Sequence, residues 1–404
     1  MLHVAPHQIE IAAAMPVESE NASSARKTLS LLALALGTFA IGTSEFASMG
    51  IIQLFSASLG VSVTEATGAV TAYAFGVIVG APVITLAAAR VNRRTLLLAL
   101  MALFVVGNIL SALASGLGYF SIARFISGLP QGAYFGAGAM IASHILGASN
   151  AGKAFAVVMA GLTVSTIFGS PIATFLGQTF GWRETYLAIS AIGLAALAAI
   201  FAMVPRSKAL DGVSVLQELS ALRRGAVWAV LASAAIGIGS IFAVYAFIGP
   251  FVTDLAQLDP SLIAVALALF GIGMTVGNSI GGRIADKDPV RGVVIGFGSA
   301  LGVLAVLALG AASPVILFPG LFGVGATMMI AIPSIQVRMT RFAPEAPSLV
   351  GAMTLAALNL ANAVGAEGGA AAIELGFGLS SAIWAGFALT AIGLAMFLIS
   401  TMRR

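Results

Sequence analysis

The feature that most constrains the fold of this chain is a succession of apolar stretches, each long enough to cross a lipid bilayer. A helix of about 20 apolar residues spans the hydrocarbon core. Soluble domains contain about 45–50% apolar and about 25% charged residues, whereas this chain of 404 residues is 59% hydrophobic and 8% charged. The surplus of apolar surface must face lipid, so the sequence predicts an all-α membrane protein with twelve spans. The predicted spans cover residues 28–50, 66–89, 95–115, 118–145, 153–178, 184–204, 226–251, 261–282, 290–311, 314–337, 347–373 and 379–401.

A polar stretch in the middle of the chain divides the spans into two groups of six. Residues 205–225 carry several charged side chains, and we interpret them as a cytoplasmic linker between two helix bundles, 28–204 and 226–404. Residues 1–27 are polar and lack the apolar core of a signal peptide. We expect them to form a disordered cytoplasmic tail.

The positions of the basic residues predict the orientation in the membrane. Cytoplasmic loops are enriched in Lys and Arg, and an arrangement with both termini inside places 17 of the 19 Lys and Arg in cytoplasmic segments. The exceptions are Arg124 and Arg183. The same rule accounts for the net charge of +4 without a nucleic-acid partner. The cytoplasmic set is Arg26, Lys27, Arg90, Arg93, Arg94, Lys153, Arg206, Lys208, Arg223, Arg224, Arg283, Lys287, Arg291, Arg338, Arg341, Arg403 and Arg404.

The two groups of spans resemble each other weakly. The second span contains Gly76 and Gly80, and the eighth contains Gly273, Gly277 and Gly281, each series at four-residue spacing. Charged residues follow both stripes: Arg90, Arg93 and Arg94 in one case, and Arg283, Asp286, Lys287 and Arg291 in the other. Two related bundles are the layout of a rocking transporter with its site between the halves. The alternative interpretation of the glycines is close helix packing.

Glu45 is the strongest candidate for a functional residue. It lies about five residues from the outer end of the first span, and a charge at such a depth costs at least about 2.5–3.5 kcal/mol. Arg124 lies at nearly equal depth in the fourth span. The protonation of a carboxylate depends on burial and on nearby cations. We therefore predict that Glu45 is a proton-coupling acid with Arg124 as its counter-charge, and that Thr38, one heptad earlier, shares its face.

The fourth span carries a polar stripe. Arg124, Ser127 and Gln131 are spaced by one and two helical turns, and Tyr134 lies one turn further. We interpret the stripe as a wall of the substrate cavity. The alternative is a set of hydrogen bonds that only hold helices together.

The eleventh span supplies further candidates for the cavity. Asn359 and Asn362 share a face, whereas Glu367 lies about 80° and 140° away from them on the helix. Glu367 is a candidate for a second coupling or cation-binding acid. It can equally extend towards the outer surface beside Glu374.

The fifth span combines small residues with a proline. Gly161, Ser165 and Gly169 follow at four-residue spacing, and Pro171 comes next. Small residues allow close approach of another helix, and a proline frees a backbone carbonyl. This pattern favours a packed bend over direct substrate binding.

Other classes of function find little support in the sequence. There is no cysteine, and three scattered histidines do not form a metal site. We find no nucleotide loop and no Ser/His/Asp set, so we expect no cofactor, no metal and no enzymatic activity. Rings of charge around a pore, as a channel needs, are also missing. A receptor or scaffold without transport remains a remote alternative, which a buried acid disfavours.

Several segments together resemble the major facilitator superfamily, and within it the drug:proton antiporters similar to bacterial arabinose-efflux-type permeases. They are G-T-S-E-F-A-S-M-G (42–50), Y-A-F-G-V-I-V-G-A-P (73–82), R-F-I-S-G-L-P-Q-G-A-Y-F-G (124–136), G-L-T-V-S-T-I-F-G-S-P (161–171), G-W-R-E-T-Y (181–186), G-N-S-I-G-G-R-I-A-D (277–286) and N-L-A-N-A-V-G-A (359–366).

The resemblance implies a bacterial inner-membrane monomer that exports drug-like, amphipathic molecules in exchange for protons by alternating access. It implies that Glu45 and Arg124 match the membrane-embedded acid and the fourth-span arginine of the family. The charged loops after Gly80 and Gly277 match its gating motifs. The chain departs from the family at Ala89, where an acid is usual, at Gln131, which replaces a histidine, and at Glu367. The alternative substrate is a metabolite such as a sugar, nucleoside or purine, although the spans carry few polar side chains.

Overall fold

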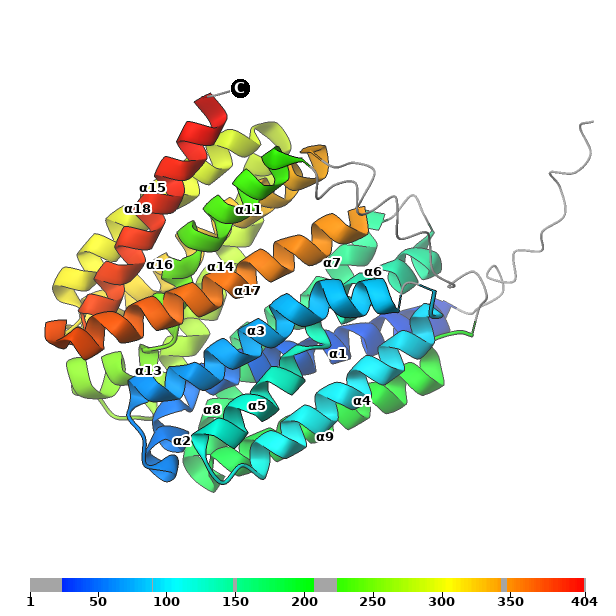
Figure 1. Cartoon of the computed structure of the whole chain (residues 1–404), viewed down its shortest axis with the longest axis horizontal. Coiled ribbons are helices and arrows are strands. Elements are labelled where there is room, and N and C mark those ends of the chain that lie inside the picture. Colours follow the sequence, from blue (N-terminus) through cyan, green and yellow to red (C-terminus); the bar gives the residue numbers. More distant parts are fainter. Residues whose placement is uncertain (1–23, 89, 148–150, 207–223, 343–346, 403–404) are drawn as a thin grey trace, which may run out of the picture.

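A computed structural model describes residues 24–88, 90–147, 151–206, 224–342 and 347–402 (Figure 1). Every regular element in these ranges is a helix. The predicted tail up to residue 23 and the linker from 207 to 223 lie outside the described residues. The first half contains α1 (Ser24–Gly50), α2 (Ile52–Leu59), α3 (Val63–Ala87), α4 (Arg93–Ala112), α5 (Leu117–Gly128), α6 (Gln131–Leu146), α7 (Ala151–Val164), the π-helix η2 (Ser165–Gly169), α8 (Ser170–Phe180) and α9 (Trp182–Met203). The second half contains α11 (Gly225–Gly237), α12 (Gly239–Tyr245), α13 (Ile248–Pro250), η5 (Phe251–Leu255), α14 (Leu262–Lys287), α15 (Pro289–Gly310), α16 (Pro314–Phe342), α17 (Pro347–Ala372), η6 (Ile373–Phe377) and α18 (Ser381–Met402).

The described residues include ten helical segments that are long and apolar enough to cross a membrane. The fourth and eleventh predicted spans are not among the ten. The fourth is the pair α5 and α6, which is interrupted at Leu129 and Pro130, and the eleventh is α17, a helix of 26 residues. The helices therefore agree with twelve spans, and the all-α membrane fold is confirmed.

One local prediction needs correction, and two local features come from the structure alone. α1 already begins at Ser24, so residues 24–27 are helical and do not belong to a tail. Glu65 lies in the first turn of α3, where it forms a capping box with Ser62. The short helix α2 between the first two spans was not expected; it ends at Gly60, whose φ of 68° suits a glycine.

The two halves lie side by side and meet along two seams. In Figure 1, α3 and α17 run next to each other through the middle of the molecule. On another side of the boundary, α14 packs against η2 and α8. We call the end of the bundle that carries Arg93 and Arg94 the basic end, and the opposite end, where α1 ends at Gly50, the distal end.

Glycine stripes hold equivalent helices together in each half. A Cβ atom on Gly80 of α3 would lie 2.1 Å from the carbonyl oxygen of Leu129, beside α5. A Cβ atom on Gly277 of α14 would lie 1.9 Å from the carbonyl oxygen of Ala326 in α16. Gly76, Gly273 and Gly281 are equally close to a neighbouring backbone: their contacts are the carbonyls of Phe125, Phe322 and Ile330. Both stripes therefore act in close helix packing.

Candidate functional site

Arg124 of α5 is fully buried and is the largest such side chain in the described part of the chain. Its guanidinium donates to the Oγ and to the backbone carbonyl of Ser44, each at 2.9 Å, and lies 3.5 Å from Oδ1 of Asn108. Two aromatic faces complete its surroundings, with ring centroids 4.5 Å away for Tyr73 and 5.2 Å away for Tyr186. Neutral oxygens and π-systems thus stabilise the cation.

Glu45 is bound by an amide. Its side chain is 5% exposed, and Nε2 of Gln131 donates to its Oε2 at 2.9 Å. The Oε1 of Gln131 accepts a hydrogen bond of 2.7 Å from the hydroxyl of Tyr73, whose ring faces Arg124. The acid and the arginine therefore belong to one buried polar network that links α1, α3, α5 and α6.

Arg124 lies near Glu45 but is not its hydrogen-bonded partner. In the residues that the structure describes, no salt bridge joins the two side chains, and Arg124 binds Ser44 while Glu45 binds Gln131. The physical reason lies in the helix, because successive residues point about 100° apart. Ser44 points at Arg124, and Glu45 points elsewhere. Arg124 acts on Glu45 through space, without a shared hydrogen bond.

Glu45 faces the second half of the molecule. Phe46, its neighbour, packs edge-on against Tyr245 of α12 with 5.5 Å between ring centroids. The hydroxyl of Tyr245 lies 3.0 Å from Oγ of Ser170 in α8, which joins the halves. Asn362 of α17 approaches the Glu45 carboxylate from the same side. The acid therefore lies at the boundary between the two bundles.

Three of the side chains expected in the cavity lie in contacts between helices. Thr38 donates to the carbonyl of Val158 in α7 at 2.7 Å. Tyr134 is fully buried beside α1, where its hydroxyl lies 3.3 Å from the carbonyl of Leu34. Ser127 donates to the carbonyl of Arg124 and packs against α4. The hydrogen bonds of Thr38 and Tyr134 therefore join helices, whereas that of Ser127 stays within α5.

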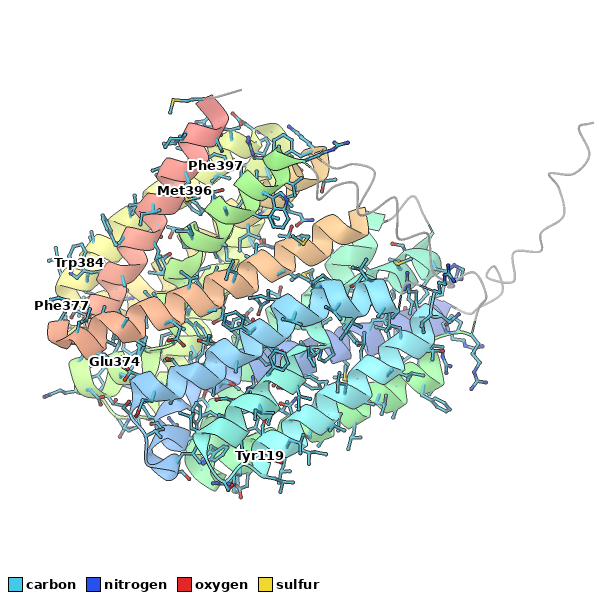
Figure 2. All side chains as sticks on the ribbon, viewed as in Figure 1. Tyr119, Glu374, Phe377, Trp384, Met396 and Phe397 are labelled. Atoms are coloured by element: carbon cyan, nitrogen blue, oxygen red, sulfur yellow. The ribbon has the colours of Figure 1, made fainter. Side chains whose placement is uncertain are left out.

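Glu367 is exposed and forms a hydrogen bond with the other half of the molecule. Its Oε1 accepts a hydrogen bond of 2.7 Å from Thr71 of α3, across the boundary between the halves. Leu360 and Glu374, two turns before and after it, are also exposed, and Glu374 lies in η6, just beyond the end of α17 (Figure 2). This face of α17 points away from Asn359 and Asn362, which are both buried.

The bend in the fifth span is a turn of π-helix. The N–H of Ser170 donates to the carbonyl of Ser165, five residues earlier, and Pro171 follows without a donor. Gly161 and Gly169 lie against α1: added Cβ atoms would be 2.0 Å from the carbonyl of Ala35 and 2.2 Å from Thr43 Oγ1. The pattern of small residues therefore marks tight packing of the bent helix on α1.

The charged residues of the expected gating loops are arranged differently in the two halves. Arg94 is buried and donates to the carbonyls of Phe201 and Val204 at the end of α9, and Arg93 donates to the carbonyl of Ala88. Arg90 is exposed. In the second half, Arg283 and Asp286 are exposed as well, and neither forms a hydrogen bond or ion pair with another side chain that the structure describes. Arg94 therefore fixes α4 to α9.

Sequence reasoning missed the ligands of the buried arginine. Ser44, Asn108 and Tyr186 lie on three different helices, and Asn108 falls outside the segments quoted for the family. The available signal was polarity: Asn108 is an amide inside a span of otherwise small and apolar residues. Polar residues at membrane depth are costly and need partners. Nothing in the sequence indicated which partner each would have.

The match to known families is decisive. A model of the Major Facilitator Superfamily matches residues 34–366. The chain belongs to this superfamily. The inner membrane transport protein YdhP of Escherichia coli K12 is 37% identical over 89% of this chain and 94% of its own length. AraJ of Escherichia coli K12 is 32% identical, over 86% of this chain and 88% of AraJ.

Two further comparisons are informative. A chloramphenicol resistance protein of Streptomyces lividans is 30% identical over 91% of this chain and 94% of its own length. Among solved structures, a bacterial homologue of the human lysosomal transporter Spinster, in an inward-facing and occupied conformation, superposes with a TM-score of 0.73. That match covers 94% of this chain and 98% of the homologue at 14% identity, and it shows a common fold. This chain is therefore a membrane transporter of the superfamily and not an enzyme.

Proposed function

We propose that this transporter is a proton-coupled antiporter that exports small amphipathic molecules, and that Glu45 carries the proton. One observation supports this role above the others: Glu45 is a buried acid at the boundary between the halves, and its bonded partner is the neutral amide of Gln131. An acid without a fixed salt bridge can gain and lose a proton as its surroundings change.

The surroundings of Glu45 suit both protonation states. The amide of Gln131 can donate to a carboxylate and also to the carbonyl oxygen of the neutral acid. Arg124 keeps its hydrogen bonds to Ser44 in either state, so protonation of Glu45 leaves no unbonded guanidinium. The network therefore supports a cycle in which Glu45 titrates while its neighbours stay in place.

Contacts between the halves support alternating access. Near the distal end, Gln53 donates to Thr253 at 2.9 Å and Gln178 donates to the carbonyl of Pro260 at 2.8 Å. Both bonds join the first half to the second half. We propose that they close the distal side and that the halves rock about the region of Phe46 and Tyr245.

Aromatic side chains around Glu45 favour an amphipathic substrate. Tyr245 packs against Phe46 and against Phe270 of α14, with 4.9 Å between the latter pair of centroids. Such surfaces bind apolar and aromatic groups, while a few polar groups orient the ligand. The relative named for chloramphenicol resistance supports a drug-like substrate and an outward direction.

We further propose the setting of this activity. Basic residues at one end of the bundle support a cytoplasmic location for both termini, and the name of YdhP supports the bacterial inner membrane. Glu45, Gln131, Tyr245 and Asn362 all come from one chain, so we propose that a monomer transports.

The test uses inside-out vesicles with a preformed acid interior and a pH-sensitive dye. Drugs, sugars and nucleosides are added in turn to vesicles that contain the wild type or Glu45→Gln. We expect an amphipathic drug to dissipate the pH gradient in the wild type and to have no effect in the variant, because Gln cannot carry a proton.

A matched control is Glu65→Gln, which replaces an exposed acid of the same half near the distal end. Gln can take the place of Glu in the capping box with Ser62, so this variant should dissipate the gradient as the wild type does. Full substrate-driven proton flux in Glu45→Gln would refute the proposed role of Glu45.

A further inference from the structure

Asn362 of α17 is fully buried, and neither its Nδ2 nor its Oδ1 has a hydrogen-bond partner in the structure. Buried polar atoms nearly always find partners, and leaving them unpaired is costly. Oγ of Ser240, Oγ of Ser334 and Oδ1 of Asn359 are also unpaired, but among the described residues Asn362 is the buried amide that lacks a partner at both ends. An amide with both ends unpaired therefore calls for a specific explanation.

The position of Asn362 indicates what it is for. Its amide lies near the Glu45 carboxylate, which belongs to the opposite half of the molecule, although neither amide atom has a partner at hydrogen-bond distance. Tyr245 and Phe46 form an aromatic wall at the same boundary. A hydrogen-bonding group placed here would meet a donor and an acceptor from Asn362 and a further acceptor from Glu45.

We propose that Asn362 recognises a neutral substrate group in which a hydrogen-bond donor lies next to an acceptor, such as a carboxamide, and that this group docks between Asn362 and Glu45. The inference deepens the proposed function, on which it rests, by naming the substrate class. An amide offers the complementary donor and acceptor that the two free atoms of Asn362 need. A permanently charged cation without N–H or O–H groups leaves both atoms unpaired.

In this arrangement the substrate contacts both halves of the molecule at once. Glu45 lies on α1 and Asn362 on α17, so a substrate held by both bridges the boundary across which the bundles rock. A site built to hydrogen-bond its ligand discriminates strongly against analogues that lack the group. Loss of one such amide should weaken binding by at least about tenfold.

The experiment measures binding to the purified full-length protein in detergent. The two probes are chloramphenicol, a neutral amide with hydroxyl groups, and tetraphenylphosphonium, a cation without hydrogen-bond donors. Asn362→Leu removes both polar atoms at similar volume, and Asn362→Asp keeps the shape but replaces the donor with a negative charge. Thr390→Val is the matched control, because it removes one buried hydrogen bond elsewhere in the second half. Each variant is first checked for a monodisperse elution profile.

We expect Asn362→Leu to bind chloramphenicol at least about tenfold more weakly and tetraphenylphosphonium within twofold of the wild type. Asn362→Asp should shift the preference towards the cation. Equal losses for both probes, unchanged binding of chloramphenicol, or a wild type that binds only the cation would each overturn the inference. The vesicle assay separates the two proposals: the expected binding pattern without proton flux contradicts antiport but leaves the recognition role of Asn362 intact.

Discussion

The two halves of this transporter share their helix packing but not their chemistry. In both, a glycine stripe brings two helices to backbone contact, α3 with α5 and α14 with α16. Among the described residues, only the first half holds an acid and an arginine together in its buried network, Glu45 and Arg124. The buried polar side chains of the second half that face this network are neutral, as are Asn362 and Tyr245.

This difference distinguishes the packing that a rocking movement requires from the ionisable group that proton coupling requires. Two similar bundles are needed for the movement, so the packing is duplicated. The proposed antiport needs a proton site only once, and a second buried acid would add a desolvation cost without a function. In the same proposal the second half contributes neutral recognition groups at the boundary.

The largest loss of stability should come from replacing Arg124, the buried cation of the first half. Arg124→Lys keeps the charge but loses the planar fork that binds Ser44 twice and stacks on Tyr73. Because a poorly satisfied buried charge is strongly destabilising, we expect a loss of about 3 kcal/mol or more, measured as thermal stability in detergent. Arg338→Lys, an 8% exposed arginine in the second half, should cost less. Equal losses would contradict the asymmetry between the halves.

Substitutions in the glycine stripes should cause intermediate losses of stability, and the losses in the two halves should be equal. Gly80→Ala and Gly277→Ala each place a Cβ within 2.1 Å of a backbone carbonyl, and overpacking of this kind costs about 1–3 kcal/mol. Both variants should lower the melting temperature to a similar extent. Gly68→Ala and Gly282→Ala serve as controls, because no atom lies within 4 Å of an added Cβ there. Clearly unequal losses at Gly80 and Gly277 would show that the packing is not duplicated.

The smallest effect should come from Glu367→Gln. The new side chain keeps an oxygen that can accept from Thr71, and the exposed position of Glu367 gives it no part in the buried network. We expect substrate-driven proton flux within about twofold of the wild type, which corresponds to less than half a kcal/mol. A loss as large as that of Glu45→Gln would place a second coupling acid in the other half and remove the asymmetry.

The fold and the key residues of the site could be predicted from the sequence to different degrees. Apolar stretches of the required length predicted the helices, and charge at membrane depth singled out Glu45 and Arg124. The partners of these two residues could not be predicted, because depth along a span does not fix direction around it. Helix rotation turned Ser44 and not Glu45 towards Arg124. The same uncertainty made Thr38 and Tyr134 look like cavity residues.

By itself, the sequence determined that this protein spans a membrane in two bundles and that an acid lies buried within the first. Hydrophobicity and charge act along the chain, and they can be evaluated without knowing which helices meet. Only the tertiary structure decided that Gln131 binds Glu45, that Asn362 faces it unpaired, and that Glu367 is exposed. These outcomes depend on how each helix is rotated against its neighbours, which is set by the packing of all of them together.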